Sequence, residues 1–336
     1  MARLGSAKAP TAVRIRSTPQ KILSIQVRFF HFISFIIRHI LCIFVPHKFD
    51  MKIYPIETGN FKLDGGAMFG VVPKALWQRT NPADANNLID MSMRCMLIED
   101  GDRLVLIDNG CGNKQSEKFF GHYYLSGDFS LESSLTKLGF HKDDITDVFL
   151  THLHFDHCGG SIQFSSNKTY YEPAFKNANY WSNSNHWQWA IKPNPREKAS
   201  FLKENIQPIK ESGQLNFISL PETNFKKQSE LGFGILFVDG HTEKMMLPHI
   251  QYKEKTLVFM ADLLPTAGHV PLPYIMGYDT RPLLTMNEKQ LFLNLAADNN
   301  FVLFLEHDSQ YELCTVKHTE KGVRLEQTYT FNEVFN

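Results

Sequence analysis

One stretch of the chain decides its fold: Thr151-His152-Leu153-His154-Phe155-Asp156-His157-Cys158-Gly159-Gly160. It places three imidazoles and one carboxylate within six consecutive residues. Imidazole and carboxylate are ligands that suit zinc and similar divalent metals. Because alternate residues of an extended segment point the same way, His152 and His154 can hold one metal while Asp156 and His157 face a second. The motif therefore predicts two metal positions side by side.

Four short apolar runs each lead into a His or an Asp. They span residues 148–150, 235–238, 256–260 and 302–305, and they lead into His152, His241, Asp262 and His307 in that order. Short apolar runs bounded by turn signals are typical of buried strands. Sites in layered α/β folds form where strand ends meet loops. We therefore expect these four strand ends to meet at one site.

The motif and the strand ends together offer seven candidate ligands, in two sets with a bridge between them: His152, His154 and His241 for one metal, Asp156, His157 and His307 for the other, and Asp262 as the bridge. Two cations held close together need anions nearby, which Asp156 and Asp262 supply. Three of these residues also have a purely structural explanation in place of metal binding. His241 would be a turn histidine, Asp262 a strand-end cap and His307 a core histidine.

Several polar residues beside these ligands have more than one explanation. Asp108 follows an apolar run at residues 104–107, and it either supports the metal site or forms a turn. Glu306 and Asp308 flank His307, and we expect them behind the ligands or facing solvent. Cys158 adjoins the motif, but since His157 is available as a ligand we expect this cysteine to be a small packed residue.

These residues resemble the metallo-β-lactamase superfamily of metal-dependent hydrolases, over roughly residues 51–336. Residues 66–74 (GAMFGVVPK) and 261–273 (ADLLPTAGHVPLP) resemble the branch that contains quorum-quenching acyl-homoserine lactonases and methyl parathion hydrolase-like enzymes. Some lactonases of that branch have a catalytic tyrosine three residues after the bridging Asp, whereas this chain has Pro265 there. A tyrosine role would have to come from elsewhere, such as Tyr278.

The pattern of elements predicts an α/β fold with four layers, an αββα sandwich, and the resemblance implies the same fold. Clusters of strands alternate with helices, which suits two packed sheets with helices outside. We expect a helix over residues 130–138, with Leu131, Leu135 and Leu138 on its buried face. A second helix would open at a capping box of Thr285 and Glu288 and run to about Asn299.

The composition of the chain limits the classes of protein to which it can belong. The 336 residues have a formal net charge of zero, but residues 1–50 hold eight Lys or Arg and one Asp, which leaves 27 basic and 34 acidic residues in the remainder. A mildly acidic body argues against nucleic acid as a substrate, because phosphate backbones are bound by basic surfaces. Five cysteines without C-x-x-C spacing give no sign of a disulfide framework, so we expect a cytoplasmic body.

The first fifty residues differ from the rest of the chain. Residues 22–45 are rich in Ile and Phe but are interrupted by Arg28 and Arg38, so no uncharged run reaches the ~18–20 residues of a membrane helix. Residues 1–50 would be an extension outside the fold, a membrane-associating segment through residues 22–45, or a folded part of the domain. The composition break at Asp50 favours a catalytic domain over residues 51–336, with Met51 at its first strand.

Residues 170–205 form an unusual aromatic segment. Trp181, Trp187 and Trp189 lie here, three of the four Trp of the chain. The segment is either an insertion that buries its aromatics in a small core of its own, or a lid over the metals that holds an apolar substrate tail. His186 would either join such a pocket or lie at the surface, and we expect the surface.

Taken together, the sequence predicts a dinuclear hydrolase. A metal-activated hydroxide would attack an ester or lactone carbonyl of the acyl-homoserine-lactone type, and Asp156 would carry the proton to the leaving group. The metals would be zinc, with manganese or cobalt as alternatives, and the substrate a small molecule with an apolar part. A phosphotriesterase or aryl-ester hydrolase on the same site, a metal-free binding protein and a homodimer stay open.

Overall fold

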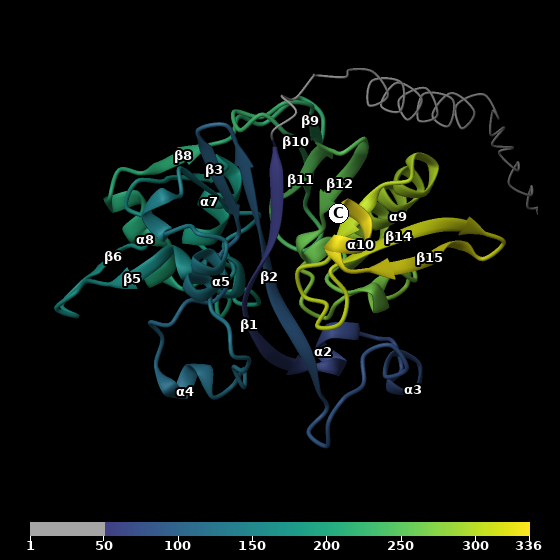
Figure 1. Ribbon diagram of the computed structural model, residues 1–336. Helices are drawn as coiled ribbons and strands as arrows, with labels where there is room; N and C mark the ends of the chain where they lie inside the picture. Colours follow the sequence, from purple (N-terminus) through teal and green to yellow (C-terminus); the bar gives the residue numbers. More distant parts are fainter. Residues whose placement is uncertain (1–50) are drawn as a thin grey trace, which may run out of the picture. The chain divides into compact units, whose positions relative to one another are not determined.

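The computed structural model describes residues 51–336, where two large β-sheets face each other (Figure 1). The expectations for residues 1–50, including membrane association through residues 22–45, lie outside the described residues. Each sheet has helices on its outer side, so the predicted four-layer αββα sandwich is confirmed.

The first sheet has six strands in the order β1-β2-β3-β4-β7-β8. β1, β2 and β3 pair antiparallel, whereas β3, β4, β7 and β8 run parallel to one another. The strands span Lys52–Asp64 (β1), Leu88–Asp100 (β2), Arg103–Ile107 (β3), Asp147–Phe149 (β4), Asn179–Ser182 (β7) and Leu215–Phe217 (β8). A separate hairpin pairs Ile162–Phe164 (β5) with Tyr171–Pro173 (β6).

The second sheet has seven strands in the order β15-β14-β13-β12-β11-β10-β9. All neighbours pair antiparallel except β12 and β13, which are parallel. The strands span Phe225–Lys226 (β9), Gly234–Val238 (β10), Met245–Tyr252 (β11), Lys255–Phe259 (β12), Val302–Phe304 (β13), Leu313–Thr319 (β14) and Gly322–Tyr329 (β15).

Alternation of side chains along the strands explains why the first sheet is covered on both faces. In β2, Met96 and Ile98 face the core between the sheets, while Cys95 and Leu97 face the helices. Successive side chains of a strand point to opposite faces, and all four are apolar and buried. A strand with this run of apolar residues needs a packed layer on each side.

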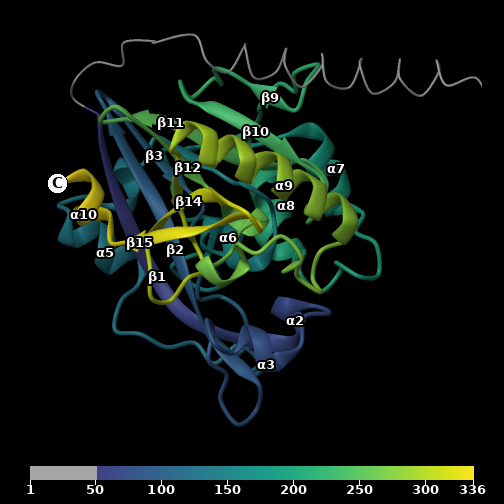
Figure 2. The ribbon, with the colours of Figure 1, turned by 90° about the vertical axis from the view of Figure 1, so that its right-hand side faces the viewer.

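Helices form the two outer layers. α5 (Leu131–Lys137), α7 (Ser184–Ile191) and α8 (Lys203–Glu211) pack on the first sheet, while α9 (Pro282–Asn299) crosses the outer face of the second (Figure 2). The remaining helices are short: α2 (Gly65–Phe69), α3 (Lys74–Trp77), α4 (Glu117–Phe120), α6 (Phe155–Cys158) and α10 (Phe331–Phe335). Within residues 51–336, no helix is long and apolar enough to span a bilayer.

The structure corrects two details of the predicted helices. Leu135 is buried as expected in α5, but Leu138 lies beyond the helix end and is 37% exposed. α9 begins at Pro282 rather than at Thr285, since proline is well suited to the first turn of a helix. Glu288 makes no capping box; its carboxylate instead accepts hydrogen bonds from the backbone of Asp239 and Gly240.

A buried arginine joins the first sheet to the end of the second. Arg94 of β2 donates through Nη1 to the carbonyl oxygens of Leu305, Asp308 and Tyr311, at 2.9, 2.9 and 3.0 Å. Its backbone amide donates to the carbonyl of Glu306 at 3.0 Å. One residue of the first sheet therefore fixes the chain on both sides of His307.

The aromatic segment at residues 170–205 is not an insertion with a core of its own. β7 lies inside the first sheet, and Trp187 is 2% exposed within the cluster that packs α5, α7 and α8 on that sheet. Trp181 packs toward the core between the sheets. These two indoles therefore cannot form the wall of a substrate lid. His186 is fully buried, so the surface expectation for it is wrong.

We predict that Trp187→Ala lowers the free energy of unfolding by about 3–5 kcal/mol, because loss of a buried indole leaves a cavity. Urea denaturation followed by circular dichroism measures this. Tyr170→Ala is the matched control, since Tyr170 is 58% exposed and surface substitutions usually change stability by less than about 0.5 kcal/mol. Equal effects of the two changes would contradict the assignment of Trp187 to the core.

Candidate metal centre

The predicted ligands lie just beyond the carboxyl ends of four strands. β4 ends at Phe149, and the chain then passes through His152 and His154 into α6, which carries Asp156 and His157. Strands of the second sheet deliver the other three: His241 after β10, Asp262 after β12 and His307 after β13. The strand-end prediction is confirmed for all four runs.

Ala261 shows that the backbone is strained at one of these turns. Its φ is 40°, in the left-handed region, immediately before Asp262. A residue with a Cβ adopts this conformation at a cost of about 1–2 kcal/mol. Such strain persists only where the surroundings fix the backbone, and here it turns the carboxylate of Asp262 into the site.

The first group consists of three imidazoles that face a common point. Nδ1 of His154 lies 3.0 Å from Nε2 of His152 and 3.2 Å from Nε2 of His241. Zinc binds imidazole nitrogen at about 2.0–2.1 Å, so nitrogens sharing one tetrahedral ion lie roughly 3.3 Å apart. The spacing fits one cation held by His152, His154 and His241.

The second group lies beside the first. Nε2 of His157 is 3.1 Å from Nε2 of His307, and Oδ2 of Asp156 is 3.9 Å from each of these nitrogens. The two rings are buried, whereas the Asp156 side chain keeps 12% of its surface exposed. The group fits a second cation with one carboxylate on its open side.

The carboxylate of Asp262 divides between the two groups. Its Oδ2 lies 3.0 Å from Nε2 of His241 and 3.9 Å from Nε2 of His152. Its Oδ1 lies 3.1 Å from Nε2 of His307 and 3.5 Å from Nε2 of His157. Oδ1 is buried and makes no hydrogen bond within the described residues, so a cation on that side would satisfy it.

In each histidine, the ring nitrogen that points away from the other ligands faces an oxygen atom. Nδ1 of His307 donates to the carbonyl of Ser92 at 2.8 Å, and Nδ1 of His241 lies 2.9 Å from Oδ1 of Asp279. Such partners fix the tautomer and orientation of a metal-binding imidazole. The remaining contacts are His152 Nδ1 to Thr151 Oγ1 at 3.2 Å and His154 Nε2 to Glu197 Oε1 at 3.5 Å.

His157 has two carboxylates on its outer nitrogen. Its Nδ1 lies 3.0 Å from Oδ2 of Asp108 and 3.1 Å from Oε2 of Glu306. Asp108 also accepts from the backbone amide and the hydroxyl of Thr151, at 2.8 and 2.6 Å. Of the two explanations for Asp108, support of the site is therefore the correct one. Glu306 is fully buried rather than facing solvent.

Sequence reasoning missed three residues that contact the ligand histidines or their backbone. Glu197, Asp279 and His186 lie far from the motif along the chain, and His186 accepts a hydrogen bond from the backbone amide of Leu153 at 2.8 Å. No local spacing marks these residues, because each is brought in by a different loop or helix. Cys158 is buried and its thiol donates to the Leu153 carbonyl at 3.3 Å, which confirms it as a packed residue.

The charges in the site fit bound cations. Burial alone lowers the pKa of His241, but Asp262 and Asp279 outweigh burial and raise it to about 10. At His307, burial again lowers the pKa, but the charge of Asp262 outweighs burial and raises the pKa to about 9. Without metal, the acids therefore retain protons on these rings. Divalent cations replace such protons when they bind to neutral imidazole, so the donor set fits two metals.

An aromatic cluster lies next to the second group. The ring of Phe155, between His154 and Asp156 in the chain, is 4.6 Å from Tyr123 and 5.3 Å from Phe119, centroid to centroid. Burial and the neighbouring Asp156 raise the pKa of Tyr123 to about 12. The apolar wall beside the metal centre thus includes side chains from the loop around α4.

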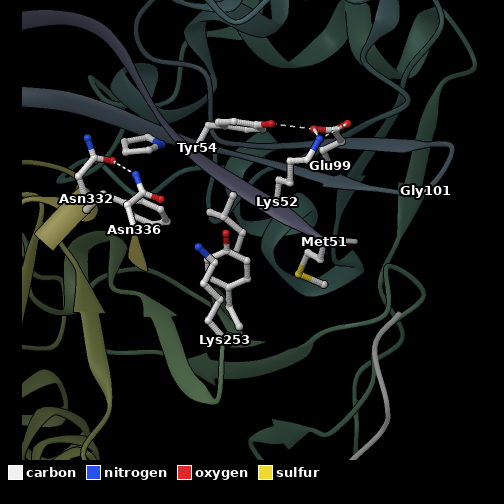
Figure 3. Close-up of a pocket in the computed structure, with 12 residues that line it drawn as sticks. Met51, Lys52, Tyr54, Glu99, Gly101, Lys253, Asn332 and Asn336 are labelled. Atoms are coloured by element: carbon white, nitrogen blue, oxygen red, sulfur yellow. Dashed lines mark hydrogen bonds and ion pairs between the residues drawn. The ribbon is translucent and has the colours of Figure 1, made fainter. Parts of the chain in front are cut away.

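A large hollow elsewhere in the domain contains none of the proposed ligands (Figure 3). It has a volume of about 580 Å³ between the start of β1 and α10. Glu99 on its wall pairs with Lys52 and Tyr54. Along β2, Glu99 is seven residues from Ser92, which contacts His307; this corresponds to roughly 23 Å of strand.

Residues 94–307 match the sequence pattern of a family described as "Metallo-beta-lactamase superfamily". The chain belongs to the metallo-beta-lactamase superfamily. With its two His/Asp clusters it is a metal-dependent hydrolase of that superfamily.

Curated relatives are distant. An N-acyl homoserine lactonase of Bacillus cereus is 23% identical over 299 residues, which cover 83% of this chain and 91% of the relative. The N-acyl homoserine lactonase AiiB of Agrobacterium fabrum is 28% identical over 117 residues, or 32% of this chain and 42% of the relative. The chain is similar to these lactonases, at identities that leave the substrate open.

Solved structures with the same fold include a "probable metal-dependent hydrolase" from Staphylococcus aureus, with a TM-score of 0.72 and 26% identity over 84% of this chain and 97% of that one. AidC, described as a dizinc quorum-quenching lactonase in complex with a product, has a TM-score of 0.66 and 21% identity over 82% and 94% of the two chains. The second likeness shows the fold alone.

Asp108→Asn should weaken metal binding by about 10–100-fold, because partners of a ligand imidazole typically have effects of this size. Competition with a chromophoric chelator measures the affinity. Asp147→Asn is the matched control: Asp147 is also buried at a strand of the first sheet, but it accepts from Trp181 Nε1 at 2.7 Å and contacts no ligand. Equal affinities of the two variants would remove the supporting role of Asp108.

Proposed function

We propose that this chain is a dinuclear metal-dependent hydrolase that opens a lactone or cleaves an ester. The observation that carries the proposal is the division of the Asp262 carboxylate, with Oδ2 toward one imidazole group and Oδ1 toward the other. A bridging carboxylate places two cations close enough to share one water. Zinc suits this set of nitrogen and carboxylate donors, with manganese or cobalt as alternatives.

Each group of residues has a separate task in the proposed reaction. His152, His154 and His241 hold one cation, and Asp156, His157 and His307 hold the other. When bound, the two ions supply a water acidified toward pKa ~7 and an electrophilic partner for the substrate carbonyl oxygen. Asp156 is partly exposed, unlike His157, so its free oxygen can accept a proton from the attacking water and pass it to the leaving alkoxide.

An acyl-homoserine lactone is the substrate class we infer. The support is likeness to lactonases across most of the chain and the aromatic cluster of Phe119, Tyr123 and Phe155 beside Asp156. Such a cluster suits an apolar acyl chain, since each buried CH₂ contributes about 0.8 kcal/mol. The substrate is therefore a small molecule with an apolar part; a homodimer stays a prediction.

Pro265 favours a second candidate, a phosphotriesterase or aryl-ester hydrolase. It stands where some lactonases have a catalytic tyrosine, and its carbonyl accepts from the His307 amide at 3.2 Å.

Tyr278 could replace that tyrosine, because it is 40% exposed and directly precedes Asp279, the partner of His241. Burial raises the pKa of Tyr278 to about 12, so its phenol would stay protonated and donate a hydrogen bond at neutral pH.

Protein loaded with zinc, manganese or cobalt and then desalted should retain two ions per chain and hydrolyse lactones. Elemental analysis and a panel of lactones, aryl esters and phosphotriesters test this together. Asp262→Ala should lose metal and activity in parallel, because it removes the bridge. A stoichiometry at or below one contradicts the dinuclear site, activity confined to phosphotriesters favours the second candidate, and a metal-free wild type favours the binding-only alternative.

Asp156→Asn should lower kcat by about 10²–10⁴-fold, the usual range for general acid–base catalysis, with a smaller loss of bound metal. Steady-state kinetics on the best substrate, with metal content measured on the same samples, separates the two effects. If loss of metal accounts for all of the lost activity, Asp156 is a ligand without a role in proton transfer.

A further inference from the structure

Two neighbouring residues of α9 reach different loops of the metal centre. Glu288 accepts from the backbone amide of Asp239 through Oε1 at 2.8 Å and from that of Gly240 through Oε2 at 2.9 Å. These two amides immediately precede His241. Both oxygens of one carboxylate therefore hold the turn that delivers a proposed ligand.

The helix also lies directly against this turn. A Cβ placed on Gly240 would come within 2.3 Å of both the backbone nitrogen and the hydroxyl of Thr285 in α9. Only glycine permits so close an approach. The turn and the helix thus form one packed unit, and Glu288 lies one helical turn beyond Thr285.

Lys289 holds the other loop. Its ammonium is buried and donates to the carbonyl oxygens of His269, Pro271 and Tyr274, at 2.9, 3.2 and 2.7 Å. This segment follows Asp262 and leads to Asp279. Burial lowers the pKa of the Lys289 amine to about 7, and the three carbonyls accept from its buried N–H groups, which would be costly to leave unpaired.

Both contacts converge on one imidazole. Glu288 fixes the backbone before His241, while Lys289 fixes the loop that brings Asp279 to Nδ1 of His241. We propose that Glu288 and Lys289 are positioning residues, which set the place and the ring orientation of His241 through two separate loops. The inference rests on the proposed metal centre only in taking His241 as a ligand.

The Glu288 carboxyl group is charged at a cost, because it is largely buried. Burial and the nearby Asp239 raise its pKa to about 7, against the two backbone donors and Lys244. Arg281, at the start of α9, also faces this turn through the carbonyl of Asp239. The ionised carboxylate offers an acceptor to each amide, whereas the protonated form offers one good acceptor. The two backbone donors therefore offset only part of the cost of burying this charge.

Amide hydrogen exchange on the full-length, metal-free chain tests the contact without reference to activity. In Glu288→Gln, the amides of Asp239 and Gly240 should exchange about tenfold faster than in the wild type, after correction for intrinsic rates. Asp298→Asn is the matched control, because Asp298 is an exposed acid of α9 that pairs only with His318 in the described residues.

Cobalt binding followed by its visible absorption tests the consequence for His241. Glu288→Gln and Lys289→Gln should each weaken one of the two binding steps by about tenfold and alter its spectrum, while Asp298→Asn should match the wild type. Glu288→Asp, one CH₂ shorter, serves if a variant fails to fold. If the variants show the wild-type amide exchange rates and the wild-type cobalt affinity, the proposal is wrong. A wild-type protein that binds no cobalt would instead contradict the proposed metal function. In that case the amide exchange rates alone decide whether Glu288 holds the turn.

Discussion

The carboxylate of Asp262, shared between two sets of imidazoles, is the interaction on which the rest of the structure depends. Five histidines and two aspartates crowd a largely buried space, where an uncompensated charge costs several kcal/mol. Several surrounding segments hold a ring in place: Asp108 just after β3, Ser92 from β2 and Asp279 from the loop before α9. The fold therefore holds a cluster of acids whose charge is balanced by protons on the rings or by bound cations.

Parallel strands explain how distant segments reach one point. In the first sheet β3 and β4 run side by side, so the residues after them, Asp108 and Thr151, meet in a hydrogen bond of 2.6 Å. In the second sheet β12 and β13 do the same for Asp262 and His307. Two parallel pairs from two sheets thus supply every proposed ligand except His241, which follows the antiparallel strand β10.

The sequence predicted this cluster of candidate ligands because its signals are local. H-x-H-x-D-H is a short motif, and His241, Asp262 and His307 each follow an apolar strand directly, so their meeting needs only the sandwich topology. The roles of Glu197, Asp279 and Glu288 were not predicted, because they depend on tertiary contacts between loops and a helix. The start of α9 was misplaced for a related reason: Thr285 and Glu288 have capping-box spacing, but the turn before His241 uses the carboxylate instead. Aromatic density at residues 170–205 likewise failed to reveal that β7 is a strand of the main sheet.

Arg94 has a consequence for how the chain acquires its metals. It binds the backbone on either side of His307 from a strand of the first sheet, so the two halves of the sandwich are locked together at the site itself. The first half supplies four ligands and the second supplies three, including the bridge. Ions held by both sets would join the same two halves, so the proposed centre is complete only once β13 has paired with β12 and brought His307 to the site.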